Sequence, residues 1–254
     1  MLQLDGVHVM KILGHRGAAG SAPENTLISF AKGLAYGVDG FEFDVQLSRD
    51  GEVVVCHDER VDRTSNGMGW IMDFTLQELK KLDFGSWFAK LPVFQAIPTL
   101  RELLEMFEVS NLELNVEIKS GLIQYPGIGE KVVSLLAEYG RLDNSIISSF
   151  DHQLLHDLKQ HYPGVKTGIL YDCAPIKPWL YAKFINAQYL HPAWYFVTPE
   201  LVTSSTVFEI GINTWTVNSS FAAKKVSMAH VSRIITDYPQ CFQKGDNGDV
   251  IWLE

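Results

Sequence analysis

The sequence predicts an α/β fold, a (β/α)8 TIM barrel with a small insertion after the second barrel strand. Short apolar runs alternate with segments of helical periodicity along most of the chain, and eight of these runs are strand candidates. The length of 254 residues and the hydrophobic content of 46% suit a single domain spanning residues 1–254. A doubly wound open sheet is the alternative fold, but the sequence contains no GxGxxG or GxxxxGK(S/T) phosphate loop.

The composition restricts the partners. A net charge of −9, from 21 Lys and Arg against 30 Asp and Glu, argues against nucleic acid or an anionic membrane surface. An anionic small-molecule substrate would need local positive charge from a metal or from placed Arg and Lys. Cys56, Cys173 and Cys241 are odd in number and lack metal-ligand spacing, which favours a reducing compartment. No signal peptide or apolar run of roughly 18 residues is present, so we expect a soluble, cytoplasmic protein of unknown oligomeric state.

The chain begins as a βαβ unit. An apolar run at residues 9–13 ends in Gly14-His15-Arg16-Gly17, and a helix follows for which Asn25 is the expected N-cap. The second strand, at residues 40–47, is expected to run parallel to the first. His15 would then lie at the carboxyl end of the first strand, beside the end of the second. A lone histidine there is more often structural than catalytic.

The stretch GFEFDVQLSRDGEVVVCHD at residues 40–58 carries the strongest chemical signal. Side chains alternate along a strand, so Glu42 and Asp44 point the same way. The turn at residues 48–51 brings a return strand, ending in His57, back toward them. Two adjacent carboxylates repel each other unless a cation lies between them, which predicts a hard metal ion. An imidazole beside it suits acid-base work on a phosphate ester. The alternative is the polar face of an exposed hairpin.

Residues 59–111 are predicted to form the insertion. A polar loop at residues 62–69 is followed by two capping boxes, Thr75 with Glu78 and Thr99 with Glu102, each opening a short helix. Functional loops gather at the carboxyl end of such barrels, so we expect a lid or wall there. An inert structural excursion is the alternative.

Strand and helix candidates alternate through the rest of the chain. The remaining barrel strands are predicted at residues 112–118, 145–149, 165–170, 188–190, 212–217 and 234–236. Helices are predicted at residues 129–139, after Asp151, near Trp179, after Thr198-Pro199 and after an N-cap at Asn218.

The third barrel strand adds a further carboxylate and a cation. Alternation places Glu113, Asn115, Glu117 and Lys119 on one face, and the last two reach the active end. Glu117 then completes three carboxylates on neighbouring strands, and Lys119 offers positive charge to a phosphate oxygen. Oxygen ligands predict one divalent cation, Mg²⁺ or Ca²⁺, without choosing between them. A solvent-facing antiparallel strand would show the same alternation.

An ordered set of motifs resembles the glycerophosphodiester phosphodiesterase family over nearly the whole chain. The matching segments are His15-Arg16-Gly17, Pro23-Glu24-Asn25-Thr26, Glu42-Phe43-Asp44-Val45, Asp50-Gly51, Val55-Cys56-His57-Asp58, Asp62-Arg63-Thr64-Ser65-Asn66-Gly67, Pro98-Thr99-Leu100, Asn115-Val116-Glu117-Ile118-Lys119, Trp215-Thr216-Val217-Asn218 and Thr236-Asp237-Tyr238-Pro239. A single short motif would mean little, whereas the ordered set is highly specific. The departures are small: Cys56 replaces a frequent aliphatic residue, and His191-Pro192 replaces a frequent Asn-Pro.

The resemblance implies a (β/α)8 barrel that hydrolyses glycerophosphodiesters to sn-glycerol 3-phosphate and an alcohol with a divalent cation. It implies His15 and His57 as the acid-base pair, in that order as base and acid. It also implies Glu42, Asp44 and Glu117 as metal ligands, with Arg16 and Lys119 binding the phosphate. Trp215 would pack against the glycerol carbons, although by its strand position alone it is more typical of core. Asp237 is expected to support Lys119 or Arg16, or to act as a cap.

Two other functions remain open from the sequence. Cleavage of lysophospholipids at the same bond would need an apolar groove, which Trp70, Phe84, Trp87 and Phe88 could line if they are not simply the core of the insertion. A catalytically inactive barrel used as a binding module would be expected to lack one of the inferred site residues, and none is missing.

Overall fold

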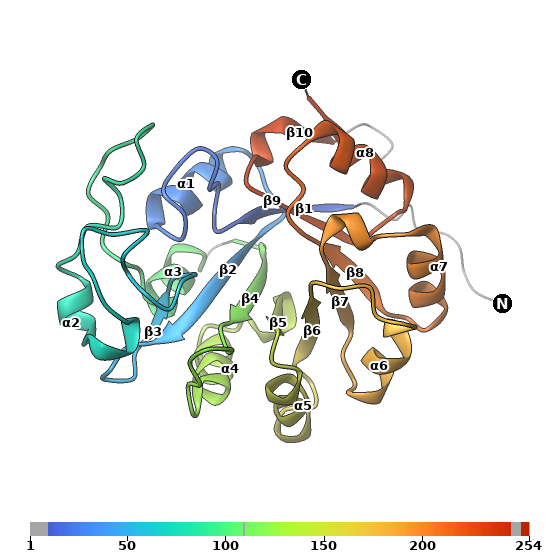
Figure 1. Cartoon of the computed structure of the whole chain (residues 1–254), viewed down its shortest axis with the longest axis horizontal. Helices are drawn as coiled ribbons and strands as arrows, with labels where there is room; N and C mark the ends of the chain where they lie inside the picture. The colour runs from blue at the N-terminus through green and yellow to red at the C-terminus, as the bar shows by residue number, and fades with distance from the viewer. Residues whose placement is uncertain (1–9, 109, 245–249, 254) are drawn as a thin grey trace.

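Parallel strands close into a barrel in the computed structural model, which describes residues 10–108, 110–244 and 250–253 (Figure 1). Within these residues eight strands form it: β1 Lys11–His15, β2 Gly40–Leu47, β4 Glu113–Ile118, β5 Ser145–Ser149, β6 Lys166–Tyr171, β7 Tyr189–Pro192, β8 Gly211–Thr214 and β9 Arg233–Thr236. Strand β1 pairs with β2 on one side and with β9 on the other, which closes the sheet. The predicted (β/α)8 barrel is confirmed.

Helices connect successive strands on the outside of the barrel (Figure 1). They are α1 Leu27–Ala35, α3 Leu100–Met106, α4 Ile128–Glu138, α5 His152–His161, α6 Pro178–Phe184, α7 Pro199–Val207 and α8 Ser220–Met228. Among the described residues, none of the helices is both long enough and apolar enough to cross a membrane.

The two faces of β2 show why the strand alternation matters. All eight of its residues are buried, because helices cover the outside and side chains fill the inside. Phe41 stacks on Phe107 of the α3 end at 5.2 Å between ring centroids and meets Phe30 of α1 edge-on at the same distance. The aromatic face of β2 therefore packs against the helices, which leaves the carboxylate face to the barrel interior.

The return strand β3, Val53–Val55, pairs antiparallel with the end of β2, as the hairpin predicted. Gly51 adopts the positive φ of 80° that the turn requires. Beyond it lie η1 Ile71–Asp73 and α2 Leu76–Leu79. Side chains from this part of the chain pack together into a small separate core, formed by Val54, Cys56, Val61, Ile71, Leu79, Phe84 and Ile97. Helix α3, in contrast, buries its leucines in the main core.

Most of the predicted helix starts are correct, and two are wrong. Both capping boxes are present, and Asp151 and Thr198 cap α5 and α7. However, Thr26 rather than Asn25 caps α1, and Ser219 rather than Asn218 caps α8. An N-cap needs extended backbone, whereas Asn25 has a left-handed φ of 55°. Both asparagine side chains instead donate to carboxylates, Asn25 to Asp44 and Asn218 to Asp237.

Two predicted strand limits also shift. The first strand runs to His15 rather than ending at Leu13, and Val9 of the predicted run lies outside the described residues. Strand β8 ends at Thr214, so Trp215 follows the strand rather than belonging to it. The remaining short elements are η2 Leu142–Asn144, η3 Trp194–Phe196, η4 Pro239–Cys241 and two unpredicted strands, β10 Phe242–Lys244 and β11 Val250–Trp252, which pair antiparallel.

Candidate active site

Three carboxylates meet inside the barrel, at the carboxyl ends of β2 and β4. Asp44 and Glu117 are direct partners in the parallel ladder, and Glu42 lies two residues before Asp44 on the same face. All three are buried, and each offers an oxygen within 4.8 Å of the others. The alternation of the two strands therefore brings Glu42, Asp44 and Glu117 together as the sequence predicted.

The three carboxyl groups differ in pKa because their surroundings differ. Burial, followed by repulsion from Asp44 and Glu117, raises the pKa of Glu42 well above its usual range. Burial also raises the pKa of Glu117, against the opposing charge of Lys119. Burial opposes ionisation of Asp44 as well, but the positive charges of Arg16 and Lys119 outweigh it and lower the pKa of that carboxyl. In the absence of a cation the cluster therefore favours retaining a proton.

A divalent cation fits this cluster. Oε2 of Glu42 and Oδ1 of Asp44 are buried and have no hydrogen-bond partner among the described residues, which is costly for carboxylate oxygens. Three ionised carboxylates also exceed the two cationic side chains, Arg16 and Lys119, that approach them. An all-oxygen ligand set suits a hard cation. The cluster can hold a divalent metal ion.

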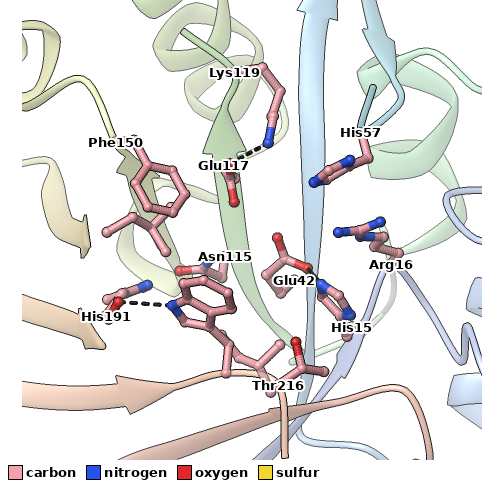
Figure 2. Close-up of a pocket in the computed structure, with 13 residues that line it drawn as sticks. His15, Arg16, Glu42, His57, Asn115, Glu117, Lys119, Phe150, His191 and Thr216 are labelled. Carbon is pink, nitrogen blue, oxygen red and sulfur yellow. Dashed lines mark hydrogen bonds and ion pairs between the residues drawn. The ribbon is translucent and has the colours of Figure 1, made fainter. Parts of the chain in front are cut away.

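His15 and His57 lie beside Glu42 and Glu117 in the pocket (Figure 2), and each forms a hydrogen bond with a carboxylate of its own. His15 is the last residue of β1, and its Nδ1 lies 2.6 Å from Oδ1 of Asp237. His57 follows β3, and its Nδ1 lies 2.6 Å from Oδ1 of Asp58. The hydrogen bond with His57 is the main cause of the lowered pKa of Asp58. Burial opposes ionisation of Asp237, but the hydrogen bond with His15 outweighs it and the pKa of Asp237 is lowered as well. Both carboxylates therefore accept a hydrogen bond from Nδ1–H. Nε2 of each ring is thereby left for other partners, and that of His15 lies 3.7 Å from Glu42.

Arg16 and Lys119 bring positive charge to the same place. Arg16 donates to Glu24 at 2.7 Å, and its Nε lies 3.5 Å from Asp44. Lys119 donates to Glu117 at 2.8 Å, and its Nζ lies 3.7 Å from Asp44. The neighbouring carboxylates outweigh burial and raise the pKa of Lys119, so the ammonium stays charged. Both cations are partly buried and held in fixed positions.

Both histidines, both cations, Glu42 and Glu117 line one pocket of about 220 Å³, which also has an apolar side (Figure 2). The lining residues are His15, Arg16, Glu42, His57, Asn115, Glu117, Lys119, Phe150, Leu170, His191, Trp215, Thr216 and Ile235. Trp215 is fixed there, because its indole N–H donates to the carbonyl of His191 at 2.9 Å and its ring meets Phe150 edge-on. The pocket thus combines a charged side, suited to a phosphate, with a side suited to carbon atoms.

Sequence reasoning missed several residues that support the site. Asp237 was expected to support Lys119 or Arg16, or to act as a cap, whereas its carboxylate contacts His15. Asn218 donates to Asp237 at 2.5 Å. Asn25, expected as a cap, donates to Asp44 at 2.9 Å. Phe150 and Leu170, which also line the pocket, were not assigned to it. The only signal for the two asparagines was their place in the motifs, because an asparagine before a helix is more typical of a cap.

The comparisons with known proteins agree with this geometry. A family model described as the glycerophosphoryl diester phosphodiesterase family matches residues 15–241. The chain belongs to this family. The match includes both histidines, the three carboxylates, Arg16, Lys119 and Trp215. The protein is accordingly an enzyme, a glycerophosphodiester phosphodiesterase.

Individual members of the glycerophosphoryl diester phosphodiesterase family are similar over most of the chain. A glycerophosphodiester phosphodiesterase of Caldanaerobacter subterraneus subsp. tengcongensis is 42% identical, over 90% of this chain and 94% of that protein. One of Bacillus altitudinis is 37% identical, over 90% and 95%. A solved phosphodiesterase of Oleispira antarctica, in complex with the product sn-glycerol-3-phosphate, is 30% identical with a TM-score of 0.83, over 91% and 94% of the two chains.

Proposed function

We propose that this enzyme hydrolyses glycerophosphodiesters to sn-glycerol 3-phosphate and an alcohol by acid-base catalysis beside one carboxylate-bound divalent cation. The observation that carries the proposal is the arrangement of the site, where three buried carboxylates lie beside two histidines that are each oriented by a carboxylate. The product in the similar Oleispira antarctica phosphodiesterase supports the same product here. In this proposal the barrel and its insertion act as one catalytic domain.

Glu42, Asp44 and Glu117 would hold the cation, Mg²⁺ or Ca²⁺. Such an ion supplies positive charge to a non-bridging phosphate oxygen and makes a nearby hydroxyl more acidic. Arg16 and Lys119 add fixed positive charge for the other phosphate oxygens. Because both side chains already lie against the carboxylates, little reorganisation is needed when the phosphate binds.

The two histidines divide the proton transfers. The side chain of His15 is 14% exposed and that of His57 is 32% exposed. The leaving alcohol is the variable part of the substrate and extends toward solvent, so His57 is placed to protonate it. His15, deeper and beside Glu42, takes the proton of the nucleophile through Nε2. Trp215 and Phe150 form the apolar wall against which the glycerol carbons pack.

The nucleophile in this proposal is the 2-hydroxyl of the glycerol. It is already tethered beside the phosphate, and a well-oriented intramolecular group is worth an effective molarity of about 10⁵ M or more. His15 takes the hydroxyl proton, the oxygen bonds to phosphorus, and the alcohol leaves with a proton from His57. Water then opens the cyclic 1,2-phosphate as the two histidines exchange roles. Among the described residues that line the pocket, none is a serine or cysteine that would supply a different nucleophile.

The substrate class is tested with a panel of phosphodiesters, assayed for release of glycerol 3-phosphate. We expect glycerophosphocholine and glycerophosphoethanolamine to be hydrolysed faster than lysophosphatidylcholine. The reason is that Phe84, one of the aromatic residues considered for an acyl groove, lies buried in the small core of the insertion instead. Faster turnover of lysophosphatidylcholine would favour the lysophospholipase D alternative, and absence of glycerol 3-phosphate would contradict the proposed reaction.

The cyclic intermediate is tested with a 2-deoxy analogue, 3-hydroxypropyl phosphocholine, at saturating concentration. We expect a large loss of kcat with binding retained, because the analogue lacks the tethered nucleophile. Binding is checked separately by competition against glycerophosphocholine. Hydrolysis at a rate near that of the parent compound would mean that water attacks phosphorus directly.

A further inference from the structure

The polar loop after β3 contains an arginine that the chemistry above does not use. Arg63 lies between Val61 and Thr64, which are both buried, at 0% and 4% exposure. Val61 joins the small core of the insertion, and its carbonyl accepts from the hydroxyl of Ser65 at 2.7 Å. Gly69 donates from its backbone to Asp62 at 2.8 Å and closes the loop. The backbone that carries Arg63 is therefore anchored on both sides.

The guanidinium of Arg63 bridges two carboxylates with four hydrogen bonds. Nε and Nη2 donate to the two oxygens of Asp58, at 2.6 and 2.9 Å. Nη1 and Nη2 donate to the two oxygens of Glu24, at 2.7 and 2.8 Å. The planar fork of an arginine matches this paired geometry, which a lysine cannot reproduce.

Each of these carboxylates also holds a functional group of the pocket. Asp58 accepts from Nδ1 of His57 at 2.6 Å, and Glu24 accepts from Arg16 at 2.7 Å. A continuous chain of charge-assisted hydrogen bonds thus runs from His57 through Asp58, Arg63 and Glu24 to Arg16. It joins the proposed general acid to one of the proposed phosphate-binding cations.

The charge on Arg63 contributes to the low pKa values of both carboxylates. The pKa of Asp58 is lowered first by its hydrogen bond to His57 and then by Arg63, and the pKa of Glu24 is lowered by Arg63 and Arg16 against the opposing effect of burial. An exposed ion pair contributes little to stability, and the Arg63 side chain is 45% exposed. Orientation is the stronger reason for this arrangement, since a displacement of about 1 Å at a catalytic group can cost about 10²-fold in rate.

We propose that Arg63 is a positioning residue, which holds His57 and Arg16 in their working orientations through Asp58 and Glu24. The inference rests on the proposed function, in which His57 protonates the leaving alcohol and Arg16 binds the phosphate. It assigns to the insertion a part in the reaction, although Arg63 itself does not line the pocket.

The test compares two substrates that differ in their need for an acid. Glycerophosphocholine releases an alcohol that must be protonated, whereas the p-nitrophenyl diester of glycerol phosphate releases a stable anion. Release of the leaving group is measured in the first turnover, before the cyclic phosphate is opened with His57 as the base. For Arg63→Met we expect choline release from glycerophosphocholine to slow about 10- to 100-fold, because His57 is misplaced. We expect p-nitrophenolate release from the p-nitrophenyl diester to slow less than about 3-fold. KM should rise for both substrates through Arg16.

Two variants serve as controls. Arg60→Met removes an arginine three positions earlier in the chain, 42% exposed, whose charge contacts are Asp62 and the ring of Trp70, and it should leave the rates with both substrates unchanged. Arg63→Lys keeps the charge but not the paired hydrogen-bond geometry of the guanidinium. It should also impair cleavage of glycerophosphocholine selectively, but less than Arg63→Met does. Circular dichroism and melting temperature establish that each variant is folded.

Each outcome decides between the proposals. His57→Ala is the reference: if it shows no selective loss for glycerophosphocholine, the proposed acid role fails and the inference fails with it. If His57→Ala shows that selective loss and Arg63→Met does not, only the inference is wrong. An equal loss for both substrates in Arg63→Met, or unchanged kinetics, would overturn the positioning role. If Arg63→Met does not fold, Arg63→Lys decides by the same comparison.

Discussion

Exhaustive chelation of divalent cations is expected to abolish hydrolysis of glycerophosphocholine, and added Mg²⁺ or Ca²⁺ is expected to restore it. The cause lies in the cluster of Glu42, Asp44 and Glu117, whose charge exceeds that of the two cations beside it. Without an ion, burial and mutual repulsion favour a protonated Glu42, and the phosphate would meet negative rather than positive charge. Glycerol 3-phosphate release is measured against total metal content.

The fold should survive chelation, because the apolar cluster that joins the strands to the helices does not depend on an ion, and circular dichroism checks this. Glu117→Gln distinguishes loss of the site from a side effect of the chelator. The Glu117→Gln substitution removes one charged ligand, so the cation concentration that gives half-maximal activity should rise about 10-fold or more. Loss of a group that only supports a metal ligand already costs about 10-fold or more in metal affinity. Full activity at negligible metal content would show that the cluster does not act through a metal.

His15→Ala and His57→Ala are each expected to lower kcat with glycerophosphocholine by about 10²- to 10⁴-fold, the contribution of a positioned general acid or base. The two variants should differ with the p-nitrophenyl diester. His15→Ala should stay impaired, because the nucleophile still needs a base. His57→Ala should recover much of the rate of p-nitrophenolate release in the first turnover, because this leaving group needs no proton, whereas opening of the cyclic phosphate stays slow. First-turnover kinetics with both substrates measure the difference.

A loss of only a few-fold with glycerophosphocholine in either variant would remove that histidine from the mechanism. The reverse pattern, in which His15→Ala is the variant recovered by p-nitrophenol, would exchange the base and the acid. His156→Ala is a suitable control, because this histidine lies in α5 and does not line the pocket. It should leave both activities unchanged.

Much of the site was predictable from strand periodicity. Glu42 and Asp44 had to share a face because side chains alternate along a strand, and Glu117 had to join them because the carboxyl ends of neighbouring parallel strands meet. The same alternation put Phe41 and Phe43 against the helices. Capping boxes located α2 and α3 for an equally local reason, since N-cap and N3 residues are three positions apart.

The partners of the histidines could not be predicted in this way. Asp237 is 222 positions from His15 in the sequence, and only closure of the barrel between β1 and β9 brings the two together. Asn25 and Asn218 looked like caps because local spacing favours that role, yet each side chain contacts a carboxylate of the site. Local rules do not foresee such contacts, because an asparagine side chain can satisfy either partner.

The sequence by itself thus determined the barrel, the grouping of its three interior carboxylates and the position of His15 at the end of a strand. These follow from periodicities of a few residues. Only the tertiary structure decided which groups orient the two histidines and that Arg63 of the insertion joins Asp58 to Glu24, 34 residues apart in the chain. Such contacts depend on how distant segments pack, and no local pattern specifies that packing.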